Sequence, residues 1–91
     1  MQEITQEITI QNKLGLHARA SGKLVDVASR YGAEIMLYKG NEEANAKSIM
    51  GLMMLAAGFG TKINLHATGE DAAEAIQAVV ELINNKFDEE D

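Results

Sequence analysis

Two residues that could carry out chemistry, His17 and Arg19, lie two positions apart in the segment KLGLHARAS at residues 13–21. The apolar pattern that follows predicts a helix beginning here, with His17 at or close to its N-cap position. The first N–H groups of a helix have no intrahelical partners and carry the positive end of the helix dipole, so such a terminus binds phosphate. Because a neutral imidazole is a competent nucleophile near neutral pH, the pattern indicates a histidine that accepts a phosphoryl group.

Arg19 would be the second residue of this helix, where a long side chain can curl over the terminus. Its guanidinium could then neutralise the oxygens of a transferring phosphoryl group. The backbone N–H groups of Ala18, Arg19 and Ala20 are the candidate phosphate-binding donors. Position alone leaves a second interpretation open, in which His17 is a partly exposed residue without a chemical role.

Length and composition indicate one small domain spanning residues 1–91, with an acidic tail at 88–91 that we expect to be frayed. The sequence contains no cysteine and two histidines, so it offers no disulfide framework and no metal site, and no cofactor is implied. The net charge of -6 argues against a nucleic-acid partner. The chain has neither an apolar run long enough to span a membrane nor a signal peptide, so we expect a cytoplasmic protein that is not inserted in a membrane.

Alternating apolar residues predict half-buried strands. The first contains Ile4, Ile8 and Ile10, the second covers residues 33–37, a weak third covers 43–46, and the fourth covers 63–67. Every strand alternates, which is typical of an antiparallel or mixed sheet with helices on one face.

Three helices are predicted between and after these strands. The first has apolar residues spaced as in an amphipathic helix up to Tyr31, with Gly32 as its C-cap. The second is a short apolar helix that starts after Ser48 and ends near Gly58. The last starts near Asp71, which has capping-box spacing to Glu74, and its buried stripe is formed by Ala72, Ile76, Val79, Val80, Ile83 and Phe87. The element order is therefore β-α-β-β-α-β-α.

Two separate motifs, GLHARAS at residues 15–21 and AKSIMGLMMLA at 46–56, resemble those of the HPr family. HPr proteins are the histidine-containing phosphocarriers of the bacterial phosphoenolpyruvate-dependent phosphotransferase system. The resemblance covers nearly the whole chain. It implies an α+β open-faced β-sandwich, in which a four-stranded antiparallel sheet is covered on one face by three helices.

The resemblance also implies roles for individual residues. His17 would be phosphorylated on Nδ1 by enzyme I and would pass the group to a histidine of an enzyme IIA protein or domain. Arg19 would be the active-centre arginine. Ser48 matches the serine that HPr kinase/phosphorylase modifies in some bacteria, although a serine at a helix start is also a common N-cap. The resemblance implies a phosphoryl carrier and not an enzyme in its own right. A monomer is the simplest expectation for a protein that shuttles between partners.

The short helix after Ser48 carries more apolar surface than one buried face requires. Leu52, Leu55 and Ala56 share a face that we expect to join the core. We expect Ile49, Met50 and Met53 to point outward beside His17 and to form a docking surface for partner proteins. The alternative is a loosely packed second core face.

The sequence departs from the commonest HPr pattern at Ala20, where the family often has proline. Alanine restores a backbone N–H, and we expect that group to join the phosphate-binding donors. A regulatory binding module of the same fold, acting through Ser48 or through complex formation, is the alternative function. The sequence does not distinguish a sugar-transport branch from a nitrogen-related or regulatory one.

Overall fold

The computed structural model describes residues 1–89 of the chain. Its elements follow the predicted order β-α-β-β-α-β-α, with one added turn of 3-10 helix, η1, near the C-terminus. The elements are β1 (Gln2–Thr9), α1 (Ala18–Ala28), β2 (Glu34–Lys39), β3 (Glu42–Asn45), α2 (Ile49–Leu55), β4 (Lys62–Gly69), α3 (Ala72–Asn84) and η1 (Lys86–Asp88).

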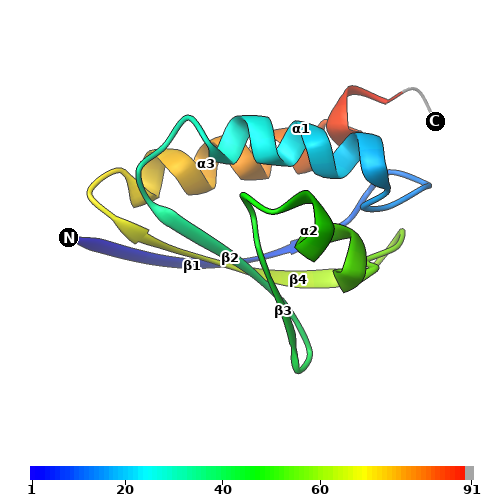
Figure 1. Cartoon of the computed structure of the whole chain (residues 1–91), viewed down its shortest axis with the longest axis horizontal. Helices are drawn as coiled ribbons and strands as arrows, with labels where there is room; N and C mark the ends of the chain where they lie inside the picture. The colour runs from blue at the N-terminus through cyan, green and yellow to red at the C-terminus, as the bar shows by residue number, and fades with distance from the viewer. Residues whose placement is uncertain (90–91) are drawn as a thin grey trace.

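The four strands form one antiparallel sheet in the order β1-β4-β2-β3. All three α-helices lie on the same side of this sheet, so the other side is open (Figure 1). The predicted one-sided α+β sandwich is therefore confirmed. The strand order was not predicted, because periodicity describes each strand separately and says nothing about which strands pair.

The alternation that predicted the strands also places the core. On β4, the side chains of Ile63, Leu65 and Ala67 are fully buried beneath the helices. His66 lies on the opposite face, where it is paired in register with Thr5 of β1 and Met36 of β2. A single parity per strand thus gives a sheet with one apolar face and one solvated face.

The first helix ends earlier than its apolar pattern predicted. α1 stops at Ala28, and the chain then tightens as the N–H groups of Arg30 and Tyr31 bond to the carbonyl oxygens of Val27 and Ala28, both at 3.2 Å. These are 3-10-type bonds, which commonly close the last turn of an α-helix. Tyr31 therefore packs against the core from the turn after the helix.

The predicted capping box at Asp71 is wrong in one respect. Asp71 occupies the N-cap position of α3, but its side chain makes no cap hydrogen bond. Its two carboxylate oxygens instead accept hydrogen bonds from the backbone N–H groups of Gly32 and Ala33, each at 2.9 Å. Asp71 thus ties the start of α3 to the loop between α1 and β2.

The short helix α2 also differs from prediction at its end. Leu52 and Leu55 are buried as expected, whereas Ala56 is exposed. Ala56 is the C-cap of α2 and has a left-handed backbone, with φ 53°, which turns the chain so that Ala57 enters the core instead. The helical spacing placed Ala56 on the buried face, but the helix ends at Leu55, so the spacing no longer applies at Ala56.

The C-terminal segment continues beyond α3, and of the tail expected at 88–91 the structure describes residues 88 and 89. Phe87 is fully buried, although it lies in η1 and not in α3. Beyond α3 the segment continues near the start of α1 (Figure 1), where Asp88 lies 3.9 Å from Lys23 Nζ and Glu89 contacts His17. Residues 90 and 91 lie outside the described part of the chain.

Candidate functional site

The segment that leads into His17 is fixed by its contact with the end of α2. Gly15 has a left-handed backbone, with φ 65°, and a Cβ atom at this position would lie 2.4 Å from the carbonyl oxygen of Ala57. That carbonyl accepts a hydrogen bond of 2.9 Å from the N–H of Leu16. Glycine is therefore required sterically as well as conformationally. The contact holds the end of α2 beside the approach to His17.

His17 occupies the N-cap position of α1, as predicted, with an extended backbone of φ -75° and ψ -179°. Its carbonyl oxygen accepts the first helical hydrogen bond, from the N–H of Ser21 at 2.8 Å. The N–H groups of Ala18, Arg19 and Ala20 precede this bond, so they have no acceptor within the helix. Since the His17 side chain makes no cap hydrogen bond either, these donors remain available to an anion.

The residues predicted to act together with His17 lie in the first turn of α1. Arg19 is exposed and forms no ion pair with any other residue in the described range 1–89. Ala20 directs its methyl group into the core, where it is fully buried, so only its backbone can contribute to the site. The His17 side chain is 28% exposed and can therefore be reached from solvent.

Two residues that were not predicted from the sequence belong to the site: Glu89 contacts His17, and Asn12 holds Glu89. The Glu89 carboxylate contacts His17 Nε2 through Oε2, and through Oε1 it accepts a hydrogen bond of 2.9 Å from Asn12 Nδ2. The same Asn12 nitrogen donates to the carbonyl oxygen of Gly15 at 2.8 Å. Neither residue belongs to a periodic pattern, and Glu89 is 72 positions from His17 in the sequence. No local signal could have revealed this cluster.

Ser48 is the N-cap of α2, as the sequence predicted. Its Oγ accepts a hydrogen bond of 3.0 Å from the N–H of Gly51. The side chain is partly exposed. Ser48 therefore has a demonstrated structural role at the start of the helix that carries Ile49 and Met50.

Large apolar side chains are exposed on α2 and in the loops before α1 and after α2. Ile49, Met50 and Met53 are exposed, as predicted, and Met54 is more exposed still, at 74%. Met54 and two loop residues were not predicted from the sequence. We call the following residues the apolar surface: Leu14, Ile49, Met50, Met53, Met54 and Phe59.

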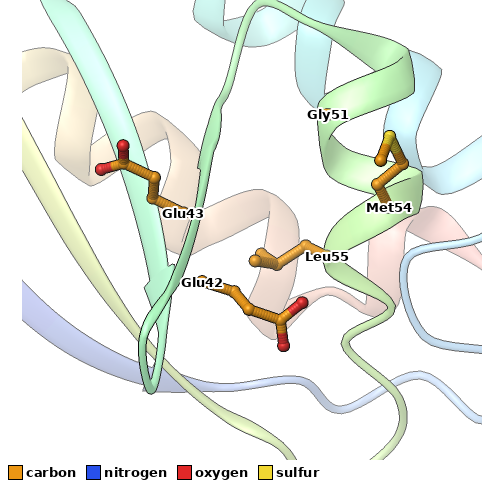
Figure 2. A pocket seen from close by; sticks show the side chains of 5 residues that line it. All are labelled: Glu42, Glu43, Gly51, Met54 and Leu55. Carbon is orange, nitrogen blue, oxygen red and sulfur yellow. The ribbon is translucent and has the colours of Figure 1, made fainter.

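A cavity of about 290 Å³ lies between β3 and α2, separate from the residues around His17. Figure 2 shows Glu42 and Glu43 on the strand side of this cavity and Met54 and Leu55 on the helix side, beside Gly51. Within residues 1–89, no group of three or more metal-ligating side chains is placed to hold an ion. No described helix is long and apolar enough to cross a membrane.

Comparison with known proteins assigns this arrangement to a family. The family model described as "PTS HPr component phosphorylation site" matches residues 4–85. The chain belongs to the HPr family. The phosphocarrier protein HPr of Pseudomonas aeruginosa is 57% identical over 84 residues, covering 91% of this chain and 93% of the relative.

The relatives include solved structures and a phosphocarrier protein with a different name. The crystal structure of an HPr from Thermoanaerobacter tengcongensis has a TM-score of 0.89 at 48% identity and covers 99% of each chain. A phosphocarrier protein named NPr, from Shewanella violacea, is 46% identical over 89 residues, covering 98% of both chains. The chain is thus a phosphocarrier of the HPr type, with relatives under both names.

Proposed function

We propose that this chain accepts a phosphoryl group on His17 from phosphorylated enzyme I and passes it to a histidine of an enzyme IIA protein or domain. The observation that carries the proposal is the position of His17 at the N-cap of α1, in front of three N–H groups without intrahelical acceptors. These donors and the helix dipole favour a dianionic group at this place. The dipole contributes only about 0.3–1 kcal/mol at an exposed site, which suits a carrier that must also release its cargo.

In the proposed transfer, the lone pair of His17 Nδ1 forms a new N–P bond while the bond between phosphorus and the donor atom of enzyme I breaks. The donor atom recovers the electron pair of the broken bond, so the step balances without a change of oxidation state. Arg19 is proposed to neutralise the phosphoryl oxygens as they pass. Its exposed guanidinium, without an ion pair in the described chain, is free to do so.

The proposed partners dock on the apolar surface. Methionine side chains adapt their shape to different partners, and Met50, Met53 and Met54 are all exposed. The hydrogen bond from Leu16 to Ala57 joins the end of α2 to the approach to His17. A protein seated on α2 would therefore lie close to the phosphoryl position. We propose that the carrier works as a cytoplasmic monomer.

Intact-mass measurement tests the proposal directly. The native protein, His17→Ala and His66→Ala would each be incubated with phosphoenolpyruvate and an active bacterial enzyme I. One acid-labile phosphoryl group is expected on the native chain and on His66→Ala, and none on His17→Ala. Because His66 is the other histidine of the sequence and lies on the solvated sheet face, it controls for non-specific modification. No mass gain on the native chain would overturn the proposal.

A regulatory role for Ser48 is a second proposal. Ser48 directly precedes Ile49 and Met50 of the apolar surface, so a phosphate on its Oγ would place negative charge where partners are proposed to dock. HPr kinase/phosphorylase is the proposed modifying protein. Ser48→Asp keeps an N-cap acceptor and adds charge, whereas Ser48→Ala removes the cap at a cost of about 1 kcal/mol. Slower transfer to His17 in Ser48→Asp alone would support the role, and equal rates in both variants would contradict it.

A further inference from the structure

The ring of His17 is held by a carboxylate that comes from the opposite end of the chain. Glu89 Oε2 contacts His17 Nε2, and Glu89 Oε1 accepts the hydrogen bond from Asn12. The Glu89 side chain is only 13% exposed, so this contact is largely shielded from water. A carboxylate accepts hydrogen bonds and has no proton to donate when ionised.

We propose that Glu89 is a positioning residue that fixes the tautomer and orientation of His17. Because the carboxylate can only accept, the proton of the neutral ring resides on Nε2, and the lone pair resides on Nδ1. Nδ1 then forms the N–P bond without a prior proton transfer, and the Nε2 proton stays where it is. The inference rests on the proposed function, since it assigns a role in the same phosphoryl transfer.

The segment that delivers Glu89 has an unusual backbone. Lys86, Phe87 and Asp88 are consecutive residues with left-handed φ angles of 57°, 54° and 62°. Such angles are costly for residues other than glycine and persist only where surrounding contacts impose them. Here the full burial of Phe87 imposes them, together with a hydrogen bond of 2.7 Å from Lys23 Nζ to the Phe87 carbonyl oxygen. The strain lies in the turn that redirects the chain toward His17.

Asn12 fixes the other oxygen of the carboxylate. This residue is fully buried, and its NH₂ group donates to both Gly15 O and Glu89 Oε1. The reverse orientation of the amide would direct its oxygen at two acceptors, so the observed orientation is the one that the hydrogen-bond partners require. Asn12 thereby links the carboxylate to the loop that leads into His17.

This arrangement makes Glu89→Gln a sharp test. The Asn12 NH₂ group requires an acceptor, so the glutamine oxygen would face Asn12 and the glutamine NH₂ would face His17 Nε2. Nε2 would then have to accept, and the proton would move to Nδ1. Glu89→Ala instead leaves the ring to water and removes any tautomer preference that the side chain imposes.

The tautomers are measured by two-bond ¹H–¹⁵N correlation spectra of protein labelled at histidine, at a pH where the spectra show neutral rings. We expect the Nε2–H form of His17 in the native protein, a shift toward the Nδ1–H form in Glu89→Gln, and a mixture in Glu89→Ala. His66, which contacts Glu3 on the open sheet face, is the internal control and should not change. Unchanged His17 signals in Glu89→Gln would overturn the inference.

The rate of phosphorylation by enzyme I supplies the second readout. A hydrogen bond to a charged group corresponds to a change of about tenfold or more in rate, so we expect Glu89→Gln to be slowed by that order and Glu89→Ala by less. Equal rates in all three proteins would contradict the positioning role even if the tautomer shifts. The spectra need no enzyme I, so a failure of the proposed function and a failure of this inference are distinguishable.

Discussion

Lys23 on α1 donates a hydrogen bond of 2.7 Å to the carbonyl oxygen of Phe87. The helix that carries His17 at its N-cap therefore also holds the segment that contains Glu89. Phe87 is fully buried, so the C-terminal turn is part of the core, and the geometry around His17 depends on it.

Replacement of Phe87 by alanine should be costly for this reason. A buried phenylalanine truncated to alanine typically lowers the free energy of unfolding by about 3–5 kcal/mol. Phe59→Ala is the matched control, because Phe59 is 68% exposed and surface substitutions usually change stability by less than ~0.5 kcal/mol. Urea denaturation of the two variants and the native chain measures both effects. An equally small loss of unfolding free energy in the two variants would show that η1 contributes no core packing.

Two glycines near the site should respond in opposite directions to alanine. At Gly15 the added Cβ would lie 2.4 Å from Ala57 O and 2.7 Å from the Cα of Gly58. The backbone must then shift, at a cost of about 1–3 kcal/mol. Gly22 lies inside α1, where an added Cβ would meet no atom within 4 Å, and alanine there should stabilise the helix by about 0.5–1 kcal/mol. Thermal melts that moved both variants in the same direction would contradict this explanation.

Arg19 should matter for transfer and not for folding. It is exposed and has no ion pair within residues 1–89, so Arg19→Ala should change the free energy of unfolding by less than ~0.5 kcal/mol. Loss of a charge-assisted contact to the phosphoryl group should slow transfer by about ten- to a hundredfold. Arg19→Lys keeps the charge but loses the planar pair of donors, and we expect an intermediate rate. Single-turnover transfer rates should fall in the order native, Arg19→Lys, Arg19→Ala. An arginine with only a structural role would not produce this order.

The sequence predicts those features that follow from a repeating spacing of apolar residues within one strand or helix. The alternation of Ile63, Leu65 and Ala67 marks a half-buried strand, and the pattern after His17 marks a helix start, and both predictions are confirmed. The strand order depends on pairing between distant segments, which no local pattern encodes. The carboxylate of Asp71 is bonded across the chain to Gly32, although its spacing to Glu74 had indicated a local cap.

The C-terminal part of the site was hidden for a related reason. The spacing from Ile83 to Phe87 correctly predicted that Phe87 is buried, but it implied a continuing helix. The left-handed turn at residues 86–88 instead redirects Glu89 toward His17. A run of acidic residues at a chain end gives no indication that one of them is held by a buried asparagine such as Asn12.

The backbone N–H of Ala20 gives the last prediction. Ala20 is the third residue of α1, and the side chain of an N-cap residue normally accepts from the second or third N–H of its helix. A phosphoryl group on the His17 ring would lie in this region, so we expect the Ala20 N–H to be among its donors. Ala20→Pro removes that donor and should shorten the lifetime of the phosphohistidine by about tenfold, the effect of one hydrogen bond to a charged group.

Ala18→Pro is the matched control for this lifetime measurement. Proline is well tolerated at the first position of a helix, and the extended backbone of His17 suits a residue that precedes proline. The Ala18 N–H is one of the three proposed donors, but an N-cap side chain normally accepts from the second or third N–H of its helix, so the lifetime should change less than in Ala20→Pro. Thermal melts of both variants would establish that α1 is intact. An unchanged lifetime in a folded Ala20→Pro protein would show that the N–H restored by alanine takes no direct part in holding the phosphoryl group.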